Sequence, residues 1–424
     1  SAMPDNGMFR NKEWLFSPDP YPISHSLLSR INTLGAATLS FQRSCNRLYL
    51  ESTKGGTHSW IAQLLDRGKP ASMIALGRSK IWNDALPKVI RPDLILTETG
   101  VSITELDSLP GGIGLTGWLG ETYAAMGDAI IGGGSGMVHG FLKSFPQHDI
   151  LISRESSDYQ PEMEWLVDRL NALEGGKRRV LNPWDLHPDD LKGASIYRFF
   201  ELWDMANVEH GEALLAMAER EEVRLSPPLK PYLEEKLWLA LFWSPALREW
   251  WEETLTPEHL QLLRECIPYG WVFDPVLLPL HAEWPQLGIH SWQEMKQFGN
   301  KERELVLKIS GWSEKSWGSR GVEIGHDLPQ TEWSKVIDDA LQSFPTNPYL
   351  LQRFHRGRVV HHPVFDAAKQ TIVSMPSRVR LCPYYFVDGD ETHLGGILAT
   401  VVPSDKKLLH GMRDAIMLPC ALEN

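Results

Sequence analysis

The sequence predicts a mixed α/β (α+β) fold built from several lobes, and three observations support this prediction. A strand–helix–strand pattern lies in the middle of the chain, a helix-rich stretch follows it, and short strands with glycine loops occupy the last third. A chain of 424 residues is also long for a single core. We therefore expect three lobes, at 1–147, 148–295 and 296–424.

Charge and composition disfavour several classes of protein. The chain has 42 Lys and Arg against 54 Asp and Glu, a formal net charge of −12, so nucleic acid is not an expected partner. The longest run without a charged residue, 129–142, has 14 residues and five glycines and is too short to span a membrane. The four cysteines form no close pair and no apolar leader precedes them, so we expect a cytoplasmic protein without a membrane partner.

The first lobe is expected to contain two helices and a hairpin. A helix is predicted around Trp60–Arg67, in a region of short apolar runs and loops. Two β-rich segments, 93–97 and 101–107, then flank a glycine and form the hairpin. A helix at 118–130 follows, and the glycine run 132–136 ends it.

The predicted hairpin carries acidic residues on one face. If its turn is an odd-numbered loop centred on Gly100, Asp93 lies opposite Asp107 and Ile95 lies opposite Glu105. The three carboxylates would then converge, which destabilises a sheet unless a cation such as Mg²⁺ neutralises them. The alternative is a solvated hairpin face that carries charge without binding a metal.

The second lobe begins with a strand at 148–153, a helix at 161–173 and a strand at 179–181, which together predict a parallel sheet. The tryptophan-rich stretch 235–251 is typical of a helical core. The alternative is an acceptor pocket in which Arg198 would clamp a carboxylate.

Polar and cationic residues flank the strands of the last lobe. Lys308 lies near the end of an apolar strand, 305–309, and precedes a loop, 310–321, whose backbone N–H groups can cup phosphate oxygens. The strand 349–354 carries Gln352, which can read an adenine edge. Arg380 lies on a later strand and can reach phosphates. The alternative for each residue is solubilising charge at a strand end.

Two other motifs are weaker. Gly112-Ile-Gly114-Leu-Thr-Gly117 fits the dinucleotide motif G-x-G-x-x-G, but the acidic strand end that this motif requires about 20 residues later is missing. The glycine run 132–136 does not form a nucleophile elbow, so a serine hydrolase is not supported. His355, His361 and His362 are expected to be exposed loop residues.

The acidic hairpin resembles that of the circularly permuted ATP-grasp ligases, in particular the glutathionylspermidine synthetase-like and eukaryotic glutathione synthetase-like families. Arg91-Pro-Asp93 and Glu105-Leu-Asp107 are similar to the Arg-x-Asp and Glu-x-Asn motifs of the first family, with Asp replacing Asn at 107. The resemblance implies that Asp93, Glu105 and Asp107 hold Mg²⁺ and that Arg91 lies over the transferred phosphate.

The last lobe extends this resemblance to the nucleotide. Lys308, followed by Gly318-Ser319-Arg320-Gly321, resembles the family's phosphate-binding lysine and glycine loop. The acidic residue after the loop arginine is missing, and Glu323 is a candidate replacement. By the same resemblance, the adenine hinge would be Leu351, Gln352 and Arg353, and Arg380 would meet the phosphates.

The resemblance implies a circularly permuted ATP-grasp fold with a Rossmann-like lobe, and a ligase that uses ATP and Mg²⁺. Small-molecule carboxylate and amine substrates would be joined through an acyl phosphate, and the acidic and cationic groups would line one cleft. Two alternatives keep the ATP site: a small-molecule phosphotransferase, and a degenerate ATP-binding protein without ligase activity. A dinucleotide-binding protein is a further alternative.

Overall fold

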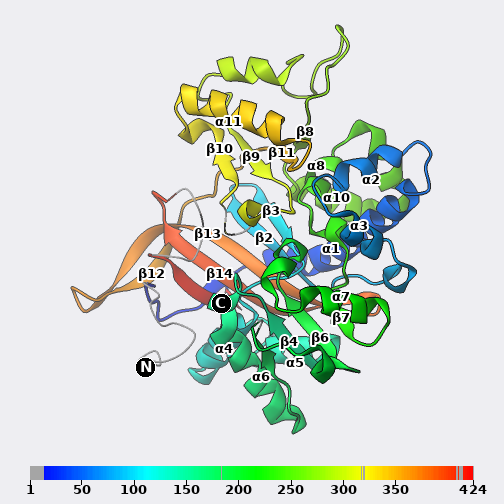
Figure 1. Ribbon diagram of the computed structural model, residues 1–424. Coiled ribbons are helices and arrows are strands. Elements are labelled where there is room, and N and C mark those ends of the chain that lie inside the picture. Colours follow the sequence, from blue (N-terminus) through cyan, green and yellow to red (C-terminus); the bar gives the residue numbers. More distant parts are fainter. Residues whose placement is uncertain are drawn as a thin grey trace. The chain divides into compact units, whose positions relative to one another are not determined.

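We describe a computed structural model that covers residues 14–182, 184–316, 318, 320–406, 409 and 414–423 (Figure 1). Within these residues the chain forms two compact units. Unit 1 takes its residues from 1–39, 84–229 and 356–424, and unit 2 takes them from 40–83 and 230–355. The units differ from the three consecutive lobes expected at 1–147, 148–295 and 296–424, because each unit combines segments that are far apart in the chain.

The larger sheet of unit 1 has the strand order β1-β15-β14-β13-β2-β3, and β12 also pairs with β13. Strand β1 joins β15 in parallel, whereas all the other neighbours are antiparallel. In Figure 1, β12 and the start of β13 form a ribbon that extends beyond the other strands. The strands are β1 (Tyr21–Ile23), β2 (Val89–Thr97), β3 (Gly100–Asp107), β12 (Val360–Asp366), β13 (Thr371–Asp388), β14 (Glu391–Pro403) and β15 (Ile416–Leu422).

Helices pack against this sheet at positions where glycine permits a close approach. The long helix α1 (His25–Ser52) begins in unit 1, and a Cβ atom at its Gly35 would lie 2.7 Å from the Tyr385 ring on β13. The Tyr385 hydroxyl donates to the carbonyl of Ile31 at 2.5 Å. Two further helices, α4 (Ile113–Ala125) and α5 (Gly136–Ser144), pack against β14.

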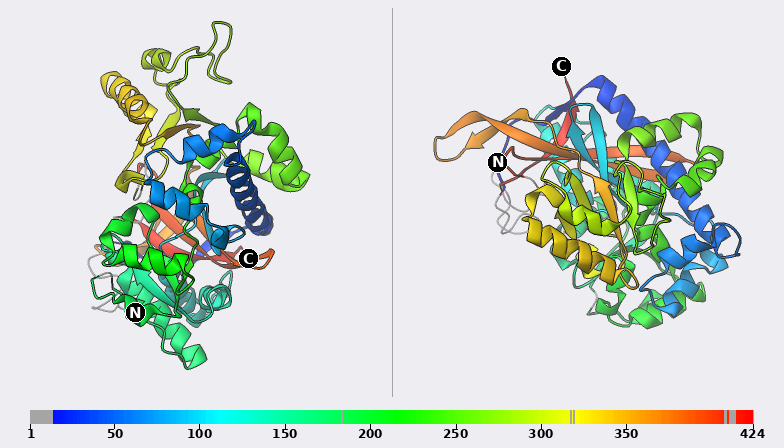
Figure 2. Two further views of the ribbon diagram at one scale, coloured as in Figure 1. Left: turned by 45° about the vertical axis from the view of Figure 1, so that its right-hand side comes forward. Right: turned by 90° about the horizontal axis from the view of Figure 1, so that it is seen from above.

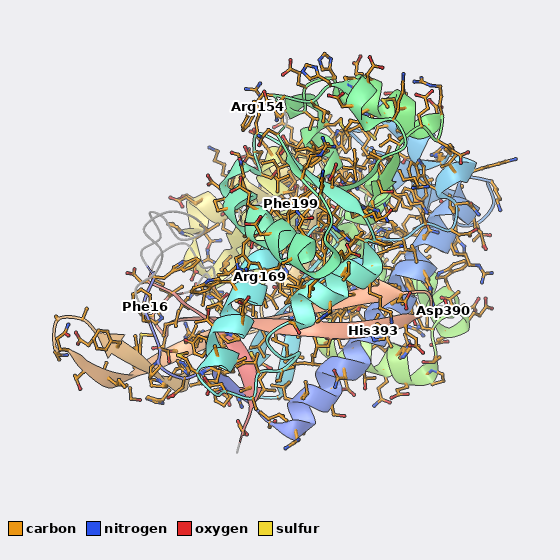
Figure 3. The ribbon with its side chains drawn as sticks, turned by 90° about the horizontal axis from the view of Figure 1, so that it is seen from below. Phe16, Arg154, Arg169, Phe199, Asp390 and His393 are labelled. Atoms are coloured by element: carbon orange, nitrogen blue, oxygen red, sulfur yellow. The ribbon has the colours of Figure 1, made fainter. Side chains whose placement is uncertain are left out.

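The second sheet of unit 1 is parallel and has the order β5-β4-β6-β7. Its strands are β4 (His148–Ile152), β5 (Val180–Leu181), β6 (Ser195–Phe199) and β7 (Arg224–Ser226). Helix α6 (Gln160–Glu174) connects β4 to β5, which confirms the predicted strand–helix–strand unit, and α7 (Gly211–Glu219) lies between β6 and β7 in the chain. Phe199 is 1% exposed, whereas Arg154 and Arg169 lie at the surface (Figure 3).

Unit 2 contains an antiparallel sheet with the order β10-β9-β11-β8. Its strands are β8 (Gly270–Phe273), β9 (Leu305–Ile309), β10 (Val322–Ile324) and β11 (Tyr349–Arg353). Helix α11 (Gln330–Ser343) contributes Trp333 and Ile337 to a hydrophobic core that also contains Leu307 and Leu351. One face of this sheet is therefore filled with apolar side chains.

Short helices complete unit 2. They pack with the end of α1 and are shown in blue and green in Figure 2. The short helices are α2 (Ser59–Leu65), α3 (Ala71–Gly77), α8 (Leu237–Leu241), α9 (Arg248–Thr254) and α10 (Pro257–Cys266). The Trp251 ring lies 5.3 Å from that of Phe41 and 5.7 Å from that of Phe242, so α1, α8 and α9 share an aromatic core. This packing confirms the core interpretation of the tryptophan-rich stretch.

The mixed α+β class is confirmed, with two differences in the first half of the chain. Helix α1, with 28 residues, was not expected in a region predicted to mix short runs and loops. Helix α4 begins five residues earlier than predicted, after Gly112 in a left-handed conformation with φ of 87°. Within the described residues, no helix has both the length and the apolar character needed to cross a membrane.

Candidate functional site

The β2–β3 hairpin differs in register from the sequence prediction. Its turn is only two residues long, because Thr97 pairs with Gly100, and the register shifts again beside Thr104. Asp93 therefore lies opposite Glu105 instead of Asp107. The predicted pairing of Ile95 with Glu105 is also wrong, because Ile95 pairs with Ser102.

The corrected register still places the predicted charged residues on one face. Arg91 lies opposite Asp107, and residues i and i+2 of a strand share a face. Arg91, Asp93, Glu105 and Asp107 therefore all lie on the same face of the hairpin. Strand β13 adds Arg380, which pairs with Ile95 across the neighbouring strands. The structure thus brings together in unit 1 the residues predicted from segments almost 300 positions apart.

These residues form an ion-pair network, which we call the arginine–aspartate cluster (Arg91, Asp93, Asp107 and Arg380). Asp93 is 3% exposed, and its Oδ1 and Oδ2 atoms lie 3.0 Å from Arg91 Nε and Arg380 Nη1. Arg91 Nη2 lies 3.0 Å from Asp107 Oδ2. The buried carboxylate of Asp93 is therefore shared by two guanidinium groups.

The two aspartates of the cluster titrate differently. Burial by itself would raise the pKa of Asp93, but the charges of Arg91 and Arg380 outweigh burial and lower it. The pKa of Asp107 is raised, first because the carboxyl group is buried and then because Glu105 is nearby, against the lowering effect of Arg91. The cluster therefore combines Asp93, which stays ionised, with Asp107, which binds a proton more readily.

The carboxylates are not arranged as a metal site in this conformation. Both oxygens of Asp93 face arginines, and Asp107 accepts from the backbone N–H of Leu109 at 2.8 Å and from Arg91. Among the described residues, no three His, Cys, Asp or Glu side chains are grouped so that they could hold a metal ion. The donor set as it stands does not fit Mg²⁺, and the assignment of Mg²⁺ to Asp93, Glu105 and Asp107 stays a prediction.

The turn after β3 is held by Arg91 and by two residues that the sequence did not indicate, Tyr384 and Glu162. Arg91 Nη1 donates to the Gly111 carbonyl at 2.9 Å, and the Tyr384 hydroxyl donates to the same oxygen at 2.6 Å. The carboxylate of Glu162, on α6, accepts from the N–H groups of Gly112 at 2.7 Å and Leu115 at 2.9 Å. Glu162 therefore caps the start of α4.

This cap argues against the dinucleotide interpretation of the glycine motif. In such a motif the pyrophosphate binds the N–H groups at the helix N-terminus, and here an internal carboxylate takes them. A Cβ atom at Gly114 would lie 2.0 Å from the Glu162 carbonyl, so this glycine serves the packing of α4 on α6. The glycine run 132–136 has a similar role, because Cβ atoms at Gly132 and Gly136 would lie 2.1 and 2.4 Å from the Gly395 carbonyl.

Arg198 is not available as a carboxylate clamp. The side chain is 1% exposed, and its three guanidinium nitrogens donate to the carbonyls of Phe200, Pro227 and Pro228 at 2.7–3.0 Å. Each of its three guanidinium nitrogens is thus used to hold the backbone. A cavity of about 460 Å³ in unit 2 is lined by members of the tryptophan-rich stretch, including Trp243 and Arg248, together with Tyr269.

In unit 2, Lys308 and Gln352 meet on the face of the sheet opposite the core of α11. Leu350 pairs with Lys308 and Val306 pairs with Gln352, so the two polar side chains are diagonal neighbours. Lys308 Nζ lies 3.0 Å from Gln352 Oε1, and the two residues are 7% and 1% exposed. The Gln352 amide nitrogen is buried and has no hydrogen-bond partner among the described residues.

The other predicted hinge residues point to the opposite face. Leu351 belongs to the hydrophobic core, and Arg353 donates to the Gln286 carbonyl at 2.6 Å and lies over the Trp271 ring. Glu323 pairs with Leu307 and not with Lys308, so it does not replace the missing loop acid on the Lys308 face. Burial, and then the charge of Glu332, raises the pKa of Glu323.

The predicted glycine loop follows β9 directly. Gly318 has a φ of +63°, and a Cβ atom at Gly321 would lie 2.4 Å from the Ile309 side chain, so both positions favour glycine. Arg320 is exposed, whereas Ser319 lies outside the described residues. The loop residues belong to unit 2 and the arginine–aspartate cluster belongs to unit 1, so the shared cleft stays a prediction.

Comparisons with known proteins were made at three levels. No protein-family model matches the chain, and no curated protein matches its sequence. Among solved structures, a glutathione synthetase-like effector from Globodera pallida, in its apo form, matches with a TM-score of 0.53 and 11% identity, over 96% of this chain and 90% of that one. A protein provisionally assigned as a gamma-glutamylcysteine synthetase, from Methylobacillus flagellatus, matches with a TM-score of 0.42 and 11% identity, over 94% of this chain and 89% of that one.

The structural similarity to the Methylobacillus flagellatus protein, with a TM-score of 0.42, is too low to indicate a shared fold. The similarity to the Globodera pallida effector extends over nearly the whole of both chains, but at 11% identity it concerns the fold and not the activity. We conclude that the chain has the overall fold of a glutathione synthetase-like protein.

Proposed function

We propose that the protein is an ATP-dependent carboxylate–amine ligase that forms an amide bond through an acyl phosphate. The observation that carries this proposal is the buried Lys308–Gln352 pair, in which the Gln352 amide N–H groups lack a partner among the described residues. A buried polar group without a partner costs free energy, and a bound ligand is one way to satisfy it. ATP suits this pair because it offers phosphate anions for Lys308 and further acceptor atoms for Gln352.

The reaction needs positioning and charge stabilisation more than covalent chemistry from the protein. A carboxylate oxygen of the acid attacks the γ-phosphorus, which releases ADP and leaves an acyl phosphate. The amine then attacks the acyl carbon, inorganic phosphate leaves, and the amine loses a proton. In this scheme Lys308 and Arg380 offset the charge of the phosphates, and Arg91 stabilises the oxyanion of acyl transfer.

The loop after β9 would contribute backbone donors. The backbone N–H groups of Gly318, Arg320 and Gly321, the described residues carried over from the resemblance, are assigned to phosphate oxygens. Mg²⁺ would neutralise phosphate charge in such a reaction. No step above depends on it, because the carboxylates assigned to it are paired with arginines in this structure.

The direct test is product formation from ATP, Mg²⁺, pooled amino acids and polyamines, followed by mass analysis. We expect ADP together with a product whose mass equals that of two components minus one water. Lys308→Met should abolish both, whereas Lys335→Met, which changes an exposed lysine on α11, should leave both unchanged. A stable phosphorylated acid without any amide would instead identify a phosphotransferase.

One observation favours a second candidate, an ATP-binding protein without ligase activity. The arginines that occupy Asp93 and Asp107 leave these carboxylates poorly placed for a metal ion. Glu105→Gln tests the metal assignment, because loss of ATP turnover with an unchanged melting temperature is expected if Glu105 holds Mg²⁺. ATP binding in the parent protein without ADP formation across the whole substrate pool would select the second candidate.

A further inference from the structure

Unit 2 contains a buried ion pair that the sequence did not indicate. Lys69 and Glu235 are 166 positions apart, yet their charged groups are in contact and their side chains are 1% and 2% exposed. Lys69 Nζ also donates to the Leu65 carbonyl at 2.5 Å. The second oxygen of Glu235 accepts from the hydroxyl of Ser310, which is 0% exposed. These three residues form what we call the Lys69–Glu235–Ser310 latch.

The latch fixes the first residue of the glycine loop. Ser310 follows β9, its backbone N–H donates to the Pro348 carbonyl at 3.0 Å, and its carbonyl accepts from the Lys236 N–H at 3.2 Å. Its Oγ atom also accepts from the N–H of Leu237 at 2.9 Å. Ser310 is therefore held through its backbone and its side chain at the point where the loop leaves the sheet.

Neighbouring contacts continue this restraint into the loop. A Cβ atom at Gly311 would lie 2.9 Å from the Glu235 carboxylate, so the chain passes directly over the latch. Lys236 Nζ donates to the Ser316 carbonyl at 2.8 Å, at the end of the 3-10 turn Glu314–Ser316. Residues 235–237 thus hold the loop at both 310 and 316.

The position of the latch suggests a role beyond stability. A buried ion pair contributes little that well-packed apolar side chains could not, so its presence calls for another explanation. Ser310 lies two residues after Lys308 and directly after Ile309, the last residue of β9. The latch therefore sets the direction of the chain immediately after the lysine assigned to phosphate binding.

We propose that Lys69, Glu235 and Ser310 are positioning residues that hold the loop from 310 to 316 in the conformation that binds nucleotide phosphates. The part of this inference that concerns the nucleotide rests on the proposed function. None of the three side chains needs to contact ATP. Glu235 acts on Ser310, Ser310 fixes the backbone of the loop, and Lys69 balances the buried charge.

The test measures the loop without nucleotide. Lys315 is exposed, so the rate of tryptic cleavage after Lys315, followed by mass spectrometry of the full chain, reports on loop opening. Ser310→Ala leaves the ion pair in place but removes both hydrogen bonds of the Ser310 hydroxyl, to Glu235 and from Leu237, and should accelerate this cleavage at least about tenfold. The double variant Lys69→Met/Glu235→Gln removes both charges but keeps an acceptor for Ser310, and should be cleaved at the parent rate. Ser343→Ala, elsewhere in unit 2, is the matched control.

The same variants are then compared in the ATP assay. Ser310→Ala should raise the KM for ATP about tenfold and leave kcat nearly unchanged, while Ser343→Ala changes neither. Cleavage of Ser310→Ala at the parent rate would overturn the latch, and faster cleavage with an unchanged KM would overturn its role in positioning the loop for ATP. Absence of ATP turnover in the parent protein would instead overturn the proposed function, and the cleavage rates would still decide whether the latch holds the loop.

Discussion

Asp93→Asn is the substitution that best tests the arginine–aspartate cluster. The change keeps the shape of the side chain but removes the one carboxylate that lies 3.0 Å from both Arg91 and Arg380. The side chain of Asp93 is 5% exposed, and those of the two arginines are 13% and 22% exposed, so water compensates little. Removing one partner of such a buried pair costs about 3–5 kcal/mol. For a domain of about 250 residues, this corresponds to a melting temperature lower by roughly 6–20 °C.

The assay is differential scanning calorimetry of the parent and variant chains at neutral pH. Glu121→Gln is the matched control in unit 1, because the side chains of the Glu121–Arg169 pair are 47% and 44% exposed. Such exposed pairs contribute only about 0–1 kcal/mol. If Asp93→Asn melted at the same temperature as Glu121→Gln, Asp93 would not be holding the two arginines, and the cluster would have to be reinterpreted.

Three further predictions concern other residues of unit 1. Burial lowers the pKa of His362 from 6.5 to about 4. The contribution of neutral His362 to the free energy of unfolding is therefore complete above pH 6.5, and it is lost as the pH falls toward 4. The loss should be about 2 kcal/mol at pH 5, measured by urea unfolding, and should be absent in His362→Asn; equal losses in both proteins would contradict the assignment. Glu162→Gln should cost about 2 kcal/mol because the cap of α4 loses its charge, whereas the exposed Glu164→Gln should be nearly neutral in the same assay. Arg198→Met should lower the melting temperature without changing the KM of either substrate, and a large KM change would restore the clamp interpretation.

Strands with strong local patterns were predictable from the sequence. The apolar run Leu305–Ile309 is bounded by polar residues, and β9 has the predicted bounds. Helix α1 was missed because it contains Gly35 and several Ser, Thr and Asn residues, which have low helix propensity, and tertiary packing against Tyr385 stabilises it instead. His362 was expected to be exposed but is 2% exposed, because its neighbours on β12 do not reveal that Ser17 packs beside it.

The members of the arginine–aspartate cluster were named from the sequence, but their pairings were not. Arg91 and Asp93 were selected from one motif and Arg380 from another, and the structure joins them in one network. The ion pair between Asp93 and Arg380 joins residues 287 positions apart, which no local pattern encodes. The predicted register of the hairpin was wrong for a simpler reason. The turn has two residues and the ladder is irregular at Thr104, and together these change which residue lies opposite each position of β2.

The parallel pairing of β1 with β15 has a consequence for biosynthesis. Residues 21–23 pair with residues 420–422, and β14 also pairs with β15, so β14 stays an edge strand until residues 416–422 have been synthesised. All segments of unit 2 have by then emerged, since its last residue is 355. Removal of β15 would therefore leave β14 as an exposed edge strand of unit 1, prone to aggregation and proteolysis, while unit 2 keeps all of its segments.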